Sequence, residues 1–261
     1  MRARSAIFDL YGDHLLARDG WAPVQAVVRL TGAVDVAAPA TRTAISRMTR
    51  EGWLAPREDH GVRGYVATAR ARARLGAAWT RIFQGPVHDW DGRWHVVVTG
   101  HVSDRSARDR LAASLQFLGY GRLGPSTWVA PRASSELGAA TAGVPLHSFH
   151  ANLEQPGAQL AAQLWDLEAL AASYSSFLLW LREQTGSCAI RSGESAYAAR
   201  ALIVHAWRKF LFTDPGLPAR LLPDAWPGQE AAERFREATT ALWPGATAYV
   251  AECLADPGAR R

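Results

Sequence analysis

A run of arginine and hydroxyl side chains between residues 40 and 51 offers the clearest chemistry in this sequence. Plotted at about 100° per residue, the run separates into two faces of a helix. The core-like face consists of Thr41, Ala44, Ile45 and Met48. The opposite face can donate hydrogen bonds and consists of Thr43, Ser46, Arg47 and Arg50, with Arg42 at its margin. Because arginine binds guanine edges, and serine and threonine bind phosphates or bases, this second face is suited to the major groove of DNA.

The elements around this run predict a winged helix-turn-helix. Two helices are expected before it, at residues 5–17 and 24–30, where apolar residues recur at helical spacing. After it, residues 53–57 and 63–68 read as two short strands around a polar turn, which is the pattern of a β-hairpin. Three helices followed by a hairpin are the parts of a winged DNA reader.

Two arginines of the expected hairpin, Arg57 and Arg63, are available for the phosphate backbone or a neighbouring minor groove. Together with the helix face they make the predicted DNA-binding set. The alternative interpretation is a dimerisation module that keeps a winged shape without binding DNA.

The distribution of charge agrees with a polyanion reader at the N-terminal end. Residues 1–86 hold 13 Arg and no Lys against 7 Asp and Glu, a net charge of +6. Residues 87–261 hold 16 Arg and Lys against 17 Asp and Glu, a net charge of −1. A strong preference for Arg over Lys explains which cation is used, but not its uneven placement. A basic module joined to a near-neutral remainder is typical of nucleic-acid binding by one part of a chain.

The middle of the chain alternates strands with helices. Residues 94–102 are rich in β-branched residues and lead into Ser103 and Asp104, an N-cap signal for a helix that runs to Leu118. A second strand at 126–130, a short helix at 135–142 and a third strand at 147–153 complete a split βαβ pattern. Residues 84–89 are expected to be the linker that precedes this domain, because Gly and Pro interrupt any periodicity there.

The remainder, from residue 156, is predicted to be helical almost throughout. One continuous helix is expected over residues 157–184, where apolar residues keep a heptad spacing at Leu160, Leu164, Leu167, Ala171, Tyr174, Leu178 and Leu181. This seam fits either the core of the same subunit or a dimer contact. The sequence therefore predicts an α+β protein of three domains: residues 1–86, 87–155 and 156–261.

The common enzyme motifs are absent from the sequence: it holds no nucleotide loop, HExxH or nucleophile elbow. Cys188 and Cys253 form neither a metal knuckle nor a disulfide framework. No signal peptide is recognised, and the most apolar long segment, residues 160–181, is too polar to cross a bilayer. We expect a cytoplasmic protein with no catalytic residues, metal site or cofactor.

Several segments resemble the PaaX-type transcriptional repressors of phenylacetate catabolism. They are residues 42–48 with 51–54, 90–94, 118–123 with 128–132, and 214–218 with 221–223 and 226–228. The resemblance spans nearly the whole chain. It implies a winged-helix head, a ferredoxin-like βαββαβ-type middle domain similar to small CRISPR-associated nucleases, and an all-helical C-terminal domain. It also implies homodimeric binding to double-stranded operator DNA, and release by an aryl-acyl-CoA effector such as phenylacetyl-CoA.

A candidate effector site lies on a helix expected over residues 196–212. His205, Arg208 and Lys209 are interspersed there with Trp207 and Phe210, so an apolar pocket with cations at its mouth could receive an acyl-CoA and its phosphates. The alternative is a solvated basic stripe that favours the helix dipole.

The sequence thus predicts a ligand-responsive repressor that controls aromatic, phenylacetate-like catabolic genes. One rival is a metal-dependent nuclease that uses the middle domain, with Asp104 as its candidate acidic residue and the winged head as anchor. Another is a repressor that responds to a protein partner instead of a small molecule.

Overall fold

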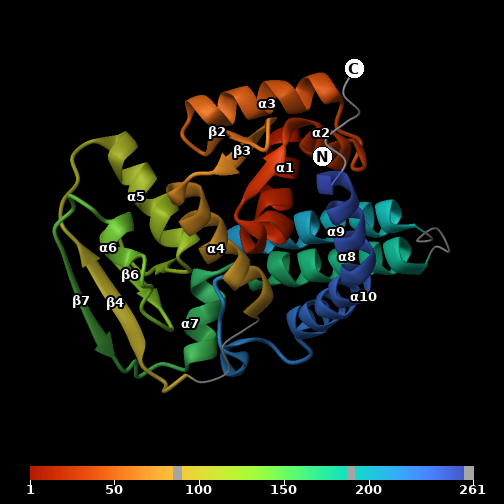
Figure 1. Ribbon diagram of the computed structural model, residues 1–261. Helices are drawn as coiled ribbons and strands as arrows, with labels where there is room; N and C mark the ends of the chain where they lie inside the picture. The colour runs from red at the N-terminus through yellow and green to blue at the C-terminus, as the bar shows by residue number, and fades with distance from the viewer. Residues whose placement is uncertain (85–89, 187–191, 256–261) are drawn as a thin grey trace. The chain divides into compact units, whose positions relative to one another are not determined.

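The structure, a computed structural model, describes residues 1–84, 90–186 and 192–255 (Figure 1). Residues 85–89 of the predicted linker and Cys188 lie outside the described residues. The fold is mixed α+β, as predicted, with two antiparallel sheets. Contacts divide the chain into two compact units. The first combines Met1–Phe83, Phe177–Arg208 and the chain from Glu230 on, and the second combines Gln84–Ser176 and Lys209–Gln229.

The first unit begins with three helical segments. The first is α1 (Ala3–Leu10), continued by a π turn (Tyr11–Leu15) and a 3-10 turn (Leu16–Arg18), and it is followed by α2 (Val24–Gly32) and α3 (Ala38–Arg50). The end of α3 is fixed by Gly52, whose φ of 72° is readily adopted by glycine. There Gly52 N donates to Thr49 O at 3.0 Å and Trp53 N donates to Met48 O at 2.9 Å. This Schellman pattern satisfies the last carbonyls of the helix and turns the chain into the hairpin.

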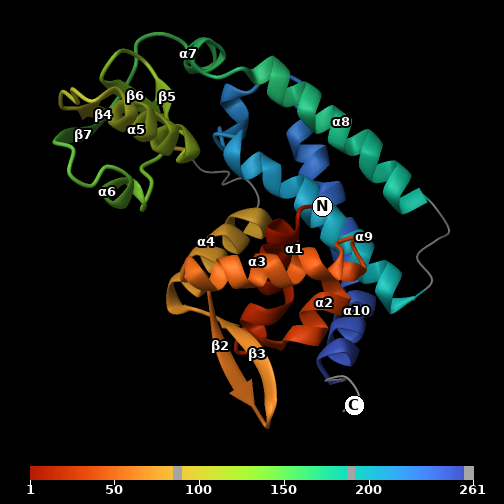
Figure 2. The same ribbon diagram turned by 90° about the horizontal axis from the view of Figure 1, so that it is seen from above.

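The hairpin consists of β2 (Leu54–Asp59) and β3 (Val62–Ala67), and α4 (Ala69–Gln84) follows it. Strand β2 ends two residues later than predicted and β3 begins one residue earlier, because the turn contains only His60 and Gly61, whose φ angles are 46° and 77°. A third strand, β1 (Trp21–Pro23), was not predicted and pairs with β3, giving the order β1-β3-β2. Figure 2 shows the hairpin extending away from α1, α2 and α3.

The hydrophobic core of the head continues into the C-terminal helices α9 (Gly193–Trp207) and α10 (Pro227–Ala255). Ile7, Leu10 and Leu30 belong to the same buried cluster as residues of these helices. Its C-terminal members are Tyr197, Ala246, Tyr249, Val250 and Cys253. The predicted segment 156–261 is therefore divided by packing between the two units, and the head shares one core with part of it.

The second unit contains the predicted ferredoxin-like domain. Its elements are β4 (Trp94–Thr99), α5 (Arg105–Phe117), β5 (Gly121–Arg122), β6 (Thr127–Ala130), α6 (Leu137–Ala140) and β7 (Leu146–Ala151). The strand order is β5-β6-β4-β7 and every pair is antiparallel, which is the βαββαβ topology. One face of the sheet packs on α5 and α6 through residues such as Val97 and Leu115. The other face contributes Trp94 and Val129 to a cluster with Leu160.

The prediction of one helix over residues 157–184 is wrong. The chain forms α7 (Gly157–Leu164) and α8 (Leu167–Gly186), separated by an extended Trp165 with φ −127° and ψ 141°. Asp166 then starts α8, because its Oδ1 accepts a hydrogen bond of 2.9 Å from Ala169 N. Most of the predicted seam is buried in this chain: Leu160, Leu167, Tyr174, Leu178 and Leu181. This burial favours the core of the same subunit over a dimer contact.

The helix predicted over residues 196–212 is α-helical from Gly193 to Trp207 and continues as a 3-10 turn, η3 (Arg208–Phe212). A second 3-10 turn, η4 (Ala219–Leu221), follows in the second unit. Among the described residues, no helix is long and apolar enough to cross a membrane.

Candidate nucleic-acid interface and effector residues

The two faces predicted for α3 are separated in the structure. The side chains toward the core are buried at Thr41, Ile45 and Met48 and half-buried at Ala44. The predicted DNA-binding side chains are all exposed: Arg42, Thr43, Ser46, Arg47 and Arg50. Exposure leaves these donors accessible to a groove, while DNA contact itself stays a prediction.

A buried pair of hydroxyls anchors the start of α3 to α2. Thr31 Oγ1 and Thr41 Oγ1 lie 2.7 Å apart, and Thr31 Oγ1 also donates to Val27 O at 2.8 Å. Both threonines are 0% exposed. Because a buried hydroxyl without a partner is costly, this chain of hydrogen bonds fixes how α3 crosses α2.

One predicted DNA-binding side chain, Arg47, is held by an ion pair. Arg47 Nε donates to Glu51 Oε1 at 2.9 Å, and Glu51 Oε2 also pairs with Arg4 Nη1 from α1. The hydrogen bond from Arg47 has the larger effect on Glu51 and the hydrogen bond from Arg4 the next largest, and both lower the pKa of Glu51. Glu51 therefore stays a carboxylate between two cations and sets the direction of both.

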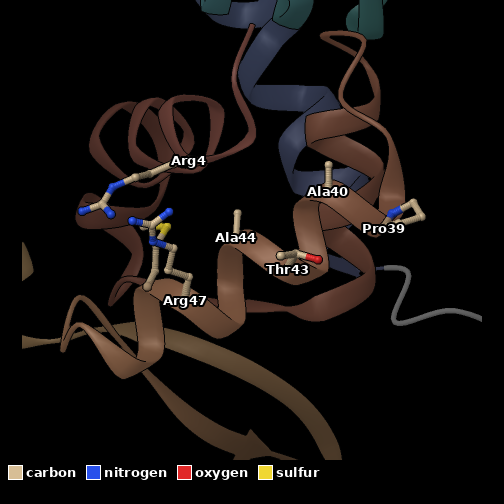
Figure 3. Close-up of a pocket in the computed structure, with 7 residues that line it drawn as sticks. Arg4, Pro39, Ala40, Thr43, Ala44 and Arg47 are labelled. Atoms are coloured by element: carbon tan, nitrogen blue, oxygen red, sulfur yellow. The ribbon is translucent and has the colours of Figure 1, made fainter.

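A groove of about 410 Å³ lies between α1 and α3. Its lining includes Arg4, Ala40, Thr43 and Arg47. In Figure 3 the guanidinium groups of Arg4 and Arg47 come from different helices and lie at the same end of the groove. Arg4 was not predicted from the sequence, because its place beside α3 depends on how α1 packs and no local sequence pattern indicates it.

The hairpin arginines have different surroundings. Arg57 donates to Asp19 Oδ2 at 2.7 Å and lies 5.7 Å from the Trp21 ring centroid, so its position is constrained. Arg63 is exposed and sits directly across the hairpin from Glu58. A carboxylate opposite Arg63 reduces the positive potential of the hairpin.

The proposed effector residues His205 and Arg208 contact the head. His205 Nδ1 lies 3.0 Å from Asp9 Oδ2, and Arg208 Nη1 lies 3.2 Å from Asp9 Oδ1. The Asp9 side chain is only 3% exposed, so the Arg208 guanidinium compensates a buried carboxylate of α1, and the His205 ring lies beside the same carboxylate. Lys209 is exposed and belongs to the second unit. The structure thus gives His205 and Arg208 a structural role, and the effector role of the three residues stays a prediction.

A second buried ion pair joins the head to α9. Arg200 donates from Nε and Nη2 to the two oxygens of Asp13, each at 2.7 Å, and both side chains are 5% exposed. The guanidinium also lies 4.6 Å from the Trp243 ring centroid. His14 stacks on the same ring at 5.1 Å, and burial lowers the pKa of His14 to about 4. No local pattern in the sequence marks this cluster, since Asp13 and Arg200 are 187 residues apart.

Asp104, the acidic residue of the nuclease alternative, is the N-cap of α5. Its Oδ1 accepts a hydrogen bond of 2.7 Å from Ala107 N. Over the part of the chain that the structure describes, there is no group of three or more His, Cys, Asp or Glu side chains placed to hold a metal ion. Asp104 is therefore explained by helix capping.

Three models of one family match successive parts of the chain. "PaaX-like protein" matches residues 2–71, "PaaX protein central Cas2-like domain" matches residues 87–154, and "PaaX-like protein C-terminal domain" matches residues 165–252. The transcriptional repressor PaaX of Escherichia coli (strain K12) is 27% identical over 95% of this chain and 83% of that protein. Among solved structures, the uncharacterized protein Rv0674 from Mycobacterium tuberculosis has the same fold. Its TM-score is 0.62 and its identity 24%, over 95% of this chain and 98% of that chain.

Proposed function

The chain belongs to the family of PaaX-like proteins, and from this premise we propose that it is a DNA-binding transcriptional repressor. The observation that supports the proposal best is the division of α3 into a buried face and a face of exposed arginine, serine and threonine side chains. A helix of this kind, followed by a β-hairpin, has the element order of a winged helix-turn-helix. The curated relative is also named a transcriptional repressor.

In this proposal, α3 enters the major groove of operator DNA. The base edges or phosphates accept hydrogen bonds from Arg42, Arg47 and Arg50. The side chains of Thr43 and Ser46 are short, so they let the helix backbone come close to the DNA. Arg57 and Arg63 bring the hairpin to the phosphate backbone. The thirteen arginines of residues 1–86 supply the general attraction to DNA.

We propose that two copies bind together, each head on one half-site. Adjacent half-sites lie about one helical turn, ~34 Å, apart along the duplex. Linking two heads raises the effective concentration of the second after the first has bound. A small change in head spacing then weakens binding strongly without any change in the recognition helices.

The proposed effector is an aryl-acyl-CoA such as phenylacetyl-CoA, and the proposed targets are genes of aromatic, phenylacetate-like catabolism. The support is the resemblance of the chain to regulators of that pathway. A regulator of this kind acts in the cytoplasm, where the operator DNA is. In the proposal the effector binds better to the state that does not hold DNA, since a ligand shifts an equilibrium only through such a difference.

The test measures, by fluorescence anisotropy, how tightly the protein binds DNA taken from the region upstream of its own gene. The titrations are made at two salt concentrations, with and without phenylacetyl-CoA. We expect sequence-specific binding that weakens with salt and is released by the thioester. Specific binding that ignores the thioester would keep the repressor and exclude this effector. Absence of specific binding to any upstream fragment would contradict the repressor itself.

A further inference from the structure

The topology of the second unit brings three chain segments to one end of its sheet. β4 is antiparallel to both β6 and β7, so the start of β4 lies beside the ends of these two strands. In register, His95 of β4 faces Ala130 of β6 and His150 of β7. The residues just before β4 and just after β6 therefore meet there, together with η4.

A hollow of about 890 Å³ opens at this end of the sheet. Its size falls within the range of about 300–1,000 Å³ that is usual for small-molecule sites. Three arginines line it, Arg93, Arg132 and Arg220, with Asp91 as its acidic residue. His150 and Trp90 are also part of the lining. The hollow is thus cationic, although the stretch of chain from residue 87 to 261 carries a net charge of −1.

The arginines are held in place by contacts inside the same unit. Arg220 donates to the backbone oxygen of Trp90, and its guanidinium carbon lies 4.3 Å from the centroid of the Trp90 ring. Arg132 donates to Gly216 O at 2.8 Å. Arg93 pairs with Asp91 at 3.5 Å. Because a guanidinium has five N–H donors, the exposed Arg93 and Arg220 keep donors for an anion.

The cost of burying charge also favours an anion here. Burial lowers the pKa of Arg132, because the partly desolvated guanidinium loses hydration. A phosphate bound in the hollow would replace that hydration with charge-assisted hydrogen bonds.

Trp90 gives the hollow a planar apolar surface. The ring is half-buried, its Nε1 donates to Arg93 O at 2.7 Å, and it packs edge-on against Trp94 at 5.2 Å. These contacts fix its orientation beside Arg220. A flat ring next to several arginines suits a ligand that combines a planar group with phosphates.

We propose that this hollow, lined by Trp90, Arg93, Arg132 and Arg220, binds a small molecule that carries phosphates and a planar ring, the class that includes the coenzyme A thioesters. The inference rests on the proposed function and deepens it, because it locates the effector on the second unit. It differs from the site predicted at His205, Arg208 and Lys209. In the structure, two of those three side chains are engaged with Asp9.

The test is isothermal titration calorimetry of the full-length protein without DNA, using phenylacetyl-CoA, coenzyme A and phenylacetate as separate probes. The variants are Arg220→Glu and Arg93→Glu, both at exposed positions of the hollow. Arg110→Glu is the matched control, since Arg110 is an exposed arginine of the same unit on α5 outside this lining. Lys209→Glu tests the site predicted from the sequence. Thermal melting checks that each variant folds.

We expect phenylacetyl-CoA and coenzyme A to bind and phenylacetate to bind much more weakly, because the phosphates carry the recognition. Each hollow variant should weaken thioester binding roughly 10- to 100-fold, the effect of losing one charge-assisted contact. Arg110→Glu and Lys209→Glu should leave it unchanged. If the folded hollow variants bind the thioester as the natural protein does, or if only Lys209→Glu weakens it, the hollow is not the site.

Parallel anisotropy with operator DNA separates this inference from the proposed function. Operator binding without any binding of the thioester or coenzyme A would overturn the hollow and leave the DNA reader. Thioester binding that the hollow variants abolish, in a protein that binds no operator, would support the hollow and contradict the repressor.

Discussion

Arg200 and Asp13 form a buried, bidentate ion pair that connects α9 to the π turn (Tyr11–Leu15) that continues α1. The pair lies inside the first unit, next to the core that the head shares with α9 and α10. Asp9 makes a similar connection to His205 and Arg208. The head is thus built on the C-terminal helices, and its stability depends on them.

Removing Arg200 should destabilise the protein strongly. Arg200→Ala leaves the Asp13 carboxylate buried without its partner, which typically costs about 3–5 kcal/mol. Urea denaturation followed by circular dichroism measures the change. Arg234→Ala is the control, since it breaks the exposed pair with Glu237 and should change little. Equal stability of both variants would show that the Asp13 contact is not important for the fold.

Stability should fall in mild acid because of His14. Burial, with smaller effects of Arg200 and Arg18 opposed by Asp13, lowers its pKa from 6.5 to about 4. The folded state therefore binds this proton less readily than the unfolded chain. The resulting stability is present above pH 6.5 and is lost as the pH falls toward 4, by about 3 kcal/mol. Urea midpoints between pH 8 and 4 measure it, and His14→Gln should flatten the curve. An unchanged slope in that variant would assign the acid sensitivity to other groups.

Much of the head could be predicted from the sequence because its signals are local. The arginine and hydroxyl face of α3, its buried face and its end at Gly52 all follow from helical spacing and from one glycine. Strands β4, β6 and β7 and the helix start at Asp104 were predicted in the same way, whereas strand β5 was not, and the full βαββαβ order was implied by the family resemblance.

The parts that could not be predicted depend on distant contacts. Leu164 and Leu167 keep the heptad spacing, yet the helix breaks at Trp165. The Trp165 ring packs closely against Gly121, since a Cβ at Gly121 would lie 2.8 Å from that ring. Strand β1 approaches β3 closely at Gly64, since a Cβ at Gly64 would lie 2.5 Å from Ala22 O. The ion pairs of Asp9 and Asp13 likewise join residues far apart in the chain.

Replacing Arg47 should weaken binding to operator DNA. If Arg47 reads a base, Arg47→Ala costs about 1–3 kcal/mol and relaxes specificity at one position. If it holds a phosphate, the loss is similar for all sequences and the salt dependence becomes shallower by about one unit. Anisotropy titrations on operator and scrambled DNA distinguish the two roles, with Arg110→Ala as the control on α5. Unchanged binding to both DNAs would refute the placement of Arg47 at the interface.

Glu51 should limit how tightly the head binds DNA of any sequence. Its carboxylate accepts from Arg47 and Arg4, so it competes with phosphates for both cations. Glu51→Gln removes that competition and one negative charge, and we expect several-fold tighter binding to scrambled DNA with a smaller gain on the operator. The ratio of the two affinities should therefore fall. A gain confined to the operator would mean that Glu51 does not restrain the two arginines.

Replacing Asp104 distinguishes its capping role from the nuclease alternative. Because Asp104 Oδ1 accepts from Ala107 N at the start of α5, Asp104→Ala should cost about 1 kcal/mol of stability. Asp104→Ser should recover most of that loss, because serine caps helices nearly as well. Binding to operator DNA should be unaffected, and incubation of DNA or RNA with Mg²⁺ or Mn²⁺ should give no cleavage that depends on Asp104. Metal-dependent cleavage lost in both variants would instead assign Asp104 to catalysis, since serine replaces the cap but not a carboxylate ligand of a metal ion.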